Sequence, residues 1–152
     1  MFYRIVDTLN EKDYLKIIEC LKDFSQEMVI VEYPTENNAI MKIKNKLNEF
    51  KIETKWLTKW PGTKLPRKKI KAKADIYNYN KFSYNVLKNS NSLISEEQEN
   101  DIDVFFLKNR NCIFFSVIHE DIHVITDPNL AENVKLLGYK LDKIPIFNLS
   151  FV

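Results

Sequence analysis

Apolar residues along the chain recur with two different periods, and the two periods alternate from the start of the sequence. Residues 2–6 and 27–33 are short apolar runs rich in β-branched and aromatic residues, which is typical of strands. Between these runs, apolar residues recur three and four positions apart, which predicts a helix with one buried stripe. The stripe consists of Tyr14, Ile17, Ile18, Leu21 and Phe24, and Thr8 and Asn10 are its candidate N-caps.

The same alternation continues through the middle of the chain. After Pro34, residues 35–50 carry apolar positions on one helical face, and residues 51–60 predict a strand that runs into a Pro-Gly turn. Residues 68–79 alternate lysine with apolar residues, which predicts a half-buried strand with a lysine-bearing edge. Residues 80–89 predict a short helix.

The last third predicts a hairpin, a capped helix and a closing segment. Residues 104–108 and 112–118 are strand-like and are joined by a short polar turn. Asp127 is placed as an N-cap with Pro128 at the first helical position, and Gly138 as the C′ residue. The apolar residues 143–152 predict either a last strand or an extension docked on the domain.

Together these elements predict one α+β domain over residues 1–152, with a mixed, largely antiparallel sheet and helices packed on one face. The pairs Phe105-Phe106 and Phe114-Phe115 each place one ring on either side of a strand. At least one ring of each pair must therefore be covered by a helix, the tail or another chain. This requirement is a modest argument for a protein partner or a homodimer.

Composition removes several classes of function. Only two glycines occur among the 152 residues, which excludes the glycine-rich phosphate loops of nucleotide-binding proteins. Cys20 and Cys112 are far apart in sequence, and two such thiols are typical of a reduced compartment. No leader-like or membrane-spanning stretch is found, so a cytoplasmic protein without a membrane partner is expected. No cofactor is expected either.

Residues 119–123 spell H-E-x-x-H and contain both histidines of the chain. On a helix, His119 and His123 could share a zinc ion while Glu120 activates water, with Glu132 as a third ligand. On one straight strand the two histidines would lie about 13 Å apart, too far to share an ion. The β-branched neighbours favour a hairpin tip instead. Across such a tip the histidines could still chelate a metal without catalysis.

Residues 51–73 contain nine basic residues against one acid, Glu53. A nucleic-acid interface here would use Trp56 or Trp60 to stack bases. Its phosphate contacts would come from Lys64, Arg67, Lys68 and Lys69. The net charge of only +2 favours the simpler interpretation, a lysine-rich strand that faces water and resists edge pairing.

Three short motifs carry a resemblance: Trp60-Pro61-Gly62-Thr63-Lys64-Leu65, the acid-led strand that begins at Asp103, and Ser116-Val117-Ile118-His119-Glu120. With the order of elements over residues 2–125, they resemble a group of small, largely uncharacterised bacilli proteins. Some of these carry an automatic "stage III sporulation protein AH" label. The resemblance implies that the His-Glu pair closes a strand and that His123 is not part of the pattern. The group has no established enzymatic activity or cofactor that the resemblance could transfer to this chain.

The leading hypothesis is a non-enzymatic protein that binds another protein, for example as a toxin-neutralising (immunity) protein. No catalytic residue is assigned, since Ser116 lies within a strand and no spacing favours a Ser/His/Asp set. The expected docking face for a basic partner is the acidic segment, consisting of Glu96, Glu97, Glu99, Asp101 and Asp103. A zinc-dependent hydrolase and a nucleic-acid-binding protein are the two alternatives.

Overall fold

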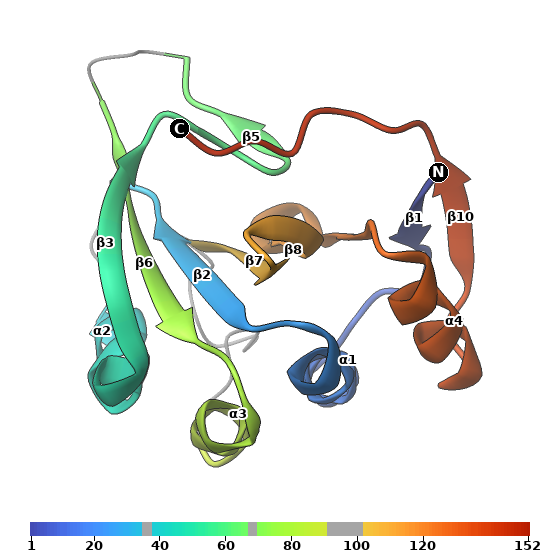
Figure 1. The fold of residues 1–152 in the computed structure, drawn as a ribbon, viewed down its shortest axis with the longest axis horizontal. Coiled ribbons are helices and arrows are strands. Elements are labelled where there is room, and N and C mark those ends of the chain that lie inside the picture. Colours follow the sequence, from blue (N-terminus) through green and yellow to red (C-terminus); the bar gives the residue numbers. More distant parts are fainter. Residues whose placement is uncertain (35–37, 67–69, 91–101) are drawn as a thin grey trace.

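A computed structural model describes residues 1–34, 38–66, 70–90 and 102–152, with side chains from residue 42 onward in the helix that begins at Asn38. Eight strands form one sheet in the order β10-β1-β9-β8-β7-β2-β6-β3 (Figure 1). Every described pair of neighbours is antiparallel. The predicted α+β class, with helices on one face of a largely antiparallel sheet, is therefore confirmed.

The elements of the structure follow the predicted order closely. The strands of the large sheet are β1 (Phe2–Ile5), β2 (Glu27–Glu32), β3 (Lys51–Leu57), β6 (Ala72–Asn78), β7 (Ile102–Lys108), β8 (Asn111–Val117), β9 (Ile122–Ile125) and β10 (Leu141–Ile144). A separate two-stranded hairpin consists of β4 (Lys59–Trp60) and β5 (Thr63–Lys64). The helices are α1 (Glu11–Phe24), α2 (Asn38–Leu47), α3 (Lys81–Lys88) and α4 (Pro128–Leu136), with 3-10 turns η1 (Asn48–Phe50) and η2 (Ile118–Glu120).

Local side-chain chemistry explains where three of these helices begin and end. Asn10 and Asn80 each form a reciprocal capping box with the third helical residue, which satisfies backbone N–H groups at the starts of α1 and α3. Asp127 caps α4 and Pro128 opens it, as predicted. Gly138 follows α4 with a φ of +99°, the left-handed conformation expected at C′.

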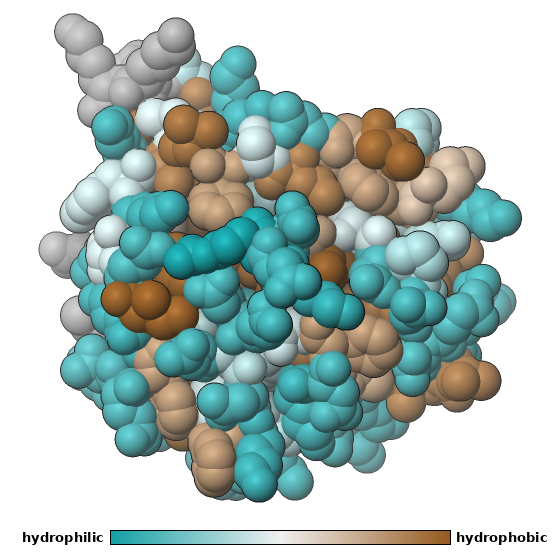
Figure 2. Space-filling view, in the orientation of Figure 1, coloured by the Kyte–Doolittle hydropathy of each residue, from teal (hydrophilic) through white to brown (hydrophobic). Residues whose placement is uncertain are grey.

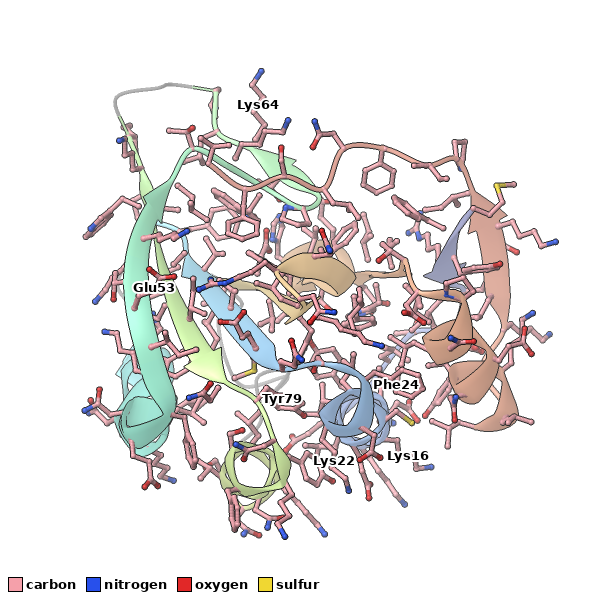
Figure 3. All side chains as sticks on the ribbon, in the orientation of Figure 1. Lys16, Lys22, Phe24, Glu53, Lys64 and Tyr79 are labelled. Carbon is pink, nitrogen blue, oxygen red and sulfur yellow. The ribbon has the colours of Figure 1, made fainter. Side chains whose placement is uncertain are left out.

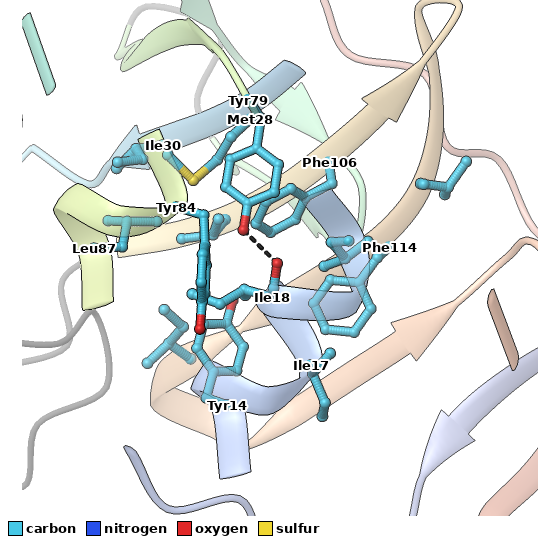
Figure 4. Packing of buried hydrophobic residues seen from close by; sticks show 14 of the residues in the cluster. Tyr14, Ile17, Ile18, Met28, Ile30, Tyr79, Tyr84, Leu87, Phe106 and Phe114 are labelled. Carbon is cyan, nitrogen blue, oxygen red and sulfur yellow. Dashed lines mark hydrogen bonds between the residues drawn. The ribbon is translucent and has the colours of Figure 1, made fainter. Parts of the chain in front are cut away.

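The helices cover one face of the sheet, the helix-side face. The buried stripe of α1 includes Tyr14, Ile17 and Ile18, and it packs against Phe106 and Phe114 of the sheet (Figure 4). Tyr79 donates its hydroxyl to the carbonyl of Ile18 within this core (Figure 4). Because a buried hydroxyl without a partner is costly, this bond favours the observed position of α1 on the sheet.

The opposite face of the sheet is covered by the β4–β5 hairpin and by the C-terminal tail, residues 145–152 (Figure 1). We call it the tail-side face. Lys59 and Val152 join hairpin and tail by two backbone hydrogen bonds: the amide of Val152 donates to the carbonyl of Lys59 at 3.0 Å, and the amide of Lys59 donates back at 3.3 Å. Of the two alternatives predicted for residues 143–152, the docked extension is found, since β10 includes only the first two of these residues and ends at Ile144.

The aromatic pairs of β7 and β8 divide between the two faces as predicted. Phe106 and Phe114 lie in the helix-side core, whereas Phe105 and Phe115 lie in the tail-side core. The ring of Phe105 lies 5.3 Å from that of Phe151, so the tail supplies part of the cover. These pairs therefore give no argument for a protein partner or a homodimer, because the chain buries them itself.

Three predicted boundaries are corrected. The strand predicted to run to residue 60 ends at Leu57, and the chain then turns into the hairpin. The lysine-bearing strand predicted from residue 68 begins at Ala72. The acidic segment does not extend through residue 103, because Ile102 and Asp103 belong to β7 and both are buried. In the part of the chain that is described, no helix is both long and apolar enough to cross a membrane.

Candidate functional site

The hairpin approaches the tail-side face at Gly62. Its φ of +85° is in the left-handed region, which glycine adopts without steric strain. A Cβ atom at this position would lie 2.6 Å from Cε2 of Phe115 and 2.9 Å from Cγ2 of Val117. Only glycine therefore allows the turn to rest directly on β8.

Trp60 and Thr63, which flank this turn, bind a buried aspartate of β7 together with Tyr33. Oδ2 of Asp103 accepts hydrogen bonds from the Tyr33 hydroxyl (2.7 Å), Trp60 Nε1 (2.8 Å) and the Thr63 hydroxyl (2.9 Å). The ring of Tyr33 also lies edge-on to those of Trp60 and His119, at 5.7 and 5.5 Å. The segments that carry the sequence resemblance thus meet at one end of the tail-side face.

The other carboxylate oxygen of Asp103, Oδ1, is buried and has no hydrogen-bond partner among the described residues. Burial raises the pKa of Asp103 above its usual range, although the three donors and the nearby His119 oppose that rise. Burial and the neighbouring Asp103 likewise raise the pKa of Tyr33. Asp103 is therefore an internal anchor for the hairpin, since a carboxylate that is 1% exposed cannot contact a partner protein.

Beside this anchor lies a pocket of about 480 Å³ between the hairpin, the tail and strands β1, β8, β9 and β10; we call it the hollow. This volume is within the range of small-molecule sites. The floor and walls of the hollow are mainly apolar: Phe115, Val117, Ile122, Val124, Ile144 and Phe147. Hydrophobic residues also gather at the molecular surface over the hairpin and the tail (Figure 2).

Three basic residues, Arg4, Lys59 and Lys64, also line the hollow, and no carboxylate does among the described residues. None of the ion pairs in the described part of the chain includes any of the three. Asp142 is paired opposite Arg4 in the β1–β10 register, without an ion pair between them. The hollow therefore combines an apolar interior with three basic side chains that form no ion pair among the described residues.

A second polar cluster lies on the helix-side face and has the residue types of a hydrolase triad. The Ser116 hydroxyl lies 2.8 Å from Nδ1 of His123, and Nε2 of His123 lies 3.0 Å from Oδ1 of Asp121. The Tyr14 hydroxyl lies 3.1 Å from Ser116. Burial lowers the pKa of His123, which favours the neutral ring, although Asp121 opposes this shift. Ser116 is only 1% exposed, so its hydroxyl is positioned for structure rather than for attack on a substrate.

The H-E-x-x-H segment does not form an α-helix. Residues 118–120 form the turn η2, Asp121 has a φ of +52°, and β9 begins at Ile122. His119 has a side chain that is 45% exposed near Tyr33, whereas His123 is buried and bonded to Ser116. Across the hairpin, His123 is paired with Ser116 and not with His119.

Glu132 lies on α4 with its carboxylate 3.5 Å from Lys135. No group of three His, Cys, Asp or Glu side chains among the described residues is placed to hold a metal ion. The three predicted ligands, His119, His123 and Glu132, are therefore not brought together in this structure.

The remaining predicted residues are divided among several places. Trp60 is 1% exposed and cannot stack on a base, whereas Trp56 is 59% exposed on the edge strand β3. Lys64 lines the hollow. Arg67, Lys68 and Lys69, and likewise Glu96, Glu97, Glu99 and Asp101, lie outside the described residues.

Sequence reasoning missed Arg4 and Lys59 as site residues. Arg4 is a polar residue within an apolar strand, and Lys59 immediately precedes the W-P-G-T motif. Neither position signals a shared site, because β1 and β4 come together only in the folded sheet. In comparisons with family models, curated proteins and solved structures, none of the three finds a match to this chain.

Proposed function

We propose that this chain is a non-enzymatic binding protein whose ligand occupies the hollow between the hairpin, the tail and the sheet. The observation that carries the proposal is a pocket of about 480 Å³ with a mainly apolar lining that the chain's own side chains leave unfilled. A mainly apolar surface concavity of this volume is typical of small-molecule sites.

The way the hollow is built supports this proposal. Gly62 fixes the hairpin against β8, Asp103 anchors it through Trp60 and Thr63, and the tail is joined to it at Lys59. The walls are therefore held by specific bonds on both sides. A site whose walls are fixed before binding loses less conformational entropy when the ligand enters.

A binding role is favoured over catalysis by the position of the polar groups. The Ser116 hydroxyl is buried on the helix-side face, whereas the hollow lies on the tail-side face. The immunity-type role, in which the bound group belongs to a protein, stays a separate proposal, because residues 96, 97, 99 and 101 of its expected docking face lie outside the described part of the chain.

The test is a titration with N-phenyl-1-naphthylamine, a neutral probe whose fluorescence rises in apolar surroundings. Ile122→Trp fills part of the hollow and is expected to abolish the rise. The matched control is Ile52→Trp, since Ile52 is 43% exposed on β3 and does not line the hollow. Urea unfolding of both variants establishes that each is folded. Equal probe binding by the two variants would show that the hollow is not the binding site.

A further inference from the structure

We infer that the ligand of the hollow is an amphipathic anion, with an aliphatic or aromatic body and one carboxylate or phosphate head. This inference rests on the proposed function, since it specifies what the hollow binds. It starts from the three basic residues that line the hollow, Arg4, Lys59 and Lys64.

The strongest single observation is the pairing of two lysines across the hairpin. Lys59 of β4 and Lys64 of β5 are directly opposite each other in register. Like charges at directly opposed positions destabilise a strand pair. The hairpin has only two residues in each strand, so no longer ladder of strand pairs offsets that repulsion, and the bonds of Trp60 and Thr63 to Asp103 keep the two lysines opposite each other. An anion at this point would convert the repulsion into attraction for both lysines.

The placement of the lysines defines where the head would lie. Lys64 is exposed and its side chain extends outward from the hairpin, whereas Lys59 is partly buried (Figure 3). Arg4 approaches from β1 on the other side of the hollow. The anionic head would therefore stay at the mouth, where water can still reach it, while the apolar body enters.

The interior of the hollow suits the rest of such a molecule. Phe115, Val117 and Val124 are almost fully buried on its floor. An apolar body that covers them is removed from water, which favours binding in proportion to the apolar area that is buried. A multiply charged or strongly polar body would find few partners there. Charge at the mouth and apolar surface inside together select an amphipathic anion.

The experiment is isothermal titration calorimetry with octanoate, octyl phosphate, 1-octanol and octyltrimethylammonium as probes. The two anions are expected to bind about tenfold more tightly than octanol, because each gains a charge-assisted contact that the alcohol lacks. Octyltrimethylammonium is expected to bind most weakly. The affinity of the anions is expected to fall as salt is added, whereas that of octanol is not. Whichever anion binds more tightly identifies the head group.

Charge variants supply the matched controls. Lys59→Met and Lys64→Met are each expected to weaken octanoate binding about threefold to tenfold relative to octanol binding by the same variant. Lys16→Met, on α1 at the opposite side of the molecule, is expected to change neither (Figure 3). If octanol binds as tightly as the anions, the charge inference is wrong while the proposed pocket stands. If neither the octyl probes nor the neutral naphthylamine binds, the proposed function itself fails.

Discussion

Nε1 of Trp60 donates a 2.8 Å hydrogen bond to Oδ2 of Asp103, a residue 43 positions away in the sequence. This bond joins the short β4–β5 hairpin to a central strand of the sheet. A hairpin of this length is not stable alone, since its two strands pair over only two residues each. The buried carboxylate therefore holds the wall of the hollow in place.

The hydroxyl of Tyr33 contributes to the same anchor, and Tyr33→Phe removes it with almost no change of shape. Because this hydroxyl donates to the Asp103 carboxylate, we expect the variant to lose about 1.5 to 3 kcal/mol of unfolding free energy. Tyr3→Phe is the control, since Tyr3 is also partly buried against the core and no hydrogen bond of its hydroxyl occurs among the described residues. Urea unfolding measures both, and equal losses would contradict a special role for the Tyr33–Asp103 bond.

The raised pKa of Asp103 predicts a particular pH dependence. A carboxyl whose folded pKa lies above its unfolded value of about 3.9 stabilises the fold most below that value, and the contribution is lost as pH rises through the folded pKa. Asp103→Asn cannot ionise. The wild type is therefore expected to lose stability relative to this variant as pH rises from about 4. A stability difference that is constant, or that moves the other way, would show that Asp103 is not held with a raised pKa.

The edge of the sheet near α2 contains an ion-pair network with the opposite pH dependence. Lys44 is 7% exposed and lies 2.5 Å from Asp75 and 2.9 Å from Glu32. Burial raises the pKa of Asp75, but hydrogen bonds from Lys44, Thr54 and Lys51 outweigh this effect and hold it below its usual range. The stability that this carboxylate provides is present above the unfolded pKa of about 3.9 and is lost as pH falls through the folded value.

Lys44→Met tests this network directly. It leaves Asp75 without its closest partner, so a loss of about 3 to 5 kcal/mol is expected at neutral pH. The loss should shrink in acid, where the carboxylate is protonated in both proteins. Lys42→Met, at an exposed position on the same helix, is expected to change stability by less than about 0.5 kcal/mol. A large loss in both variants would assign the effect to α2 in general rather than to the ion pair.

Alanine substitutions at the two glycines distinguish the cost of backbone strain from the cost of steric overlap. Both have a positive φ, but a Cβ at Gly62 would overlap Phe115 and Val117, whereas Gly138 has open space around it. Gly138→Ala is expected to lose about 1 kcal/mol of unfolding free energy from backbone conformation alone. Gly62→Ala should lose about 1 to 3 kcal/mol more, because the hairpin must move off β8. Thermal unfolding in parallel measures the difference, and a smaller loss at position 62 would mean that the hairpin does not rest on the sheet.

The sequence predicted those parts of the fold that depend on neighbouring residues. The cap at Asp127, the proline at 128 and the glycine at 138 act within one helix, so their pattern is sufficient to place it. The acidic residues that precede Asp103 predict that it belongs to the acidic segment, whereas its burial depends on Trp60 and Tyr33. Local composition does not contain that information.

The candidate site was the least predictable part of the structure, because it depends on contacts between residues that are far apart in the sequence. Arg4, Lys59 and Val124 come from three strands that are far apart in sequence, and only the topology brings them to one pocket. Trp60 shows how local sequence can also predict a binding residue that the fold buries. Its basic neighbours favoured a stacking surface, but its indole N–H is used by a buried carboxylate and the ring is covered.

The most direct test of the account is a nuclear Overhauser measurement between octanoate and the methyl groups of the protein. If the anion occupies the hollow, its methylene protons should show contacts to the methyl groups of Val117, Ile122, Val124 and Ile144. Contacts confined to other exposed apolar residues, such as Leu136 at the end of α4, would contradict the account, as would no contact at all.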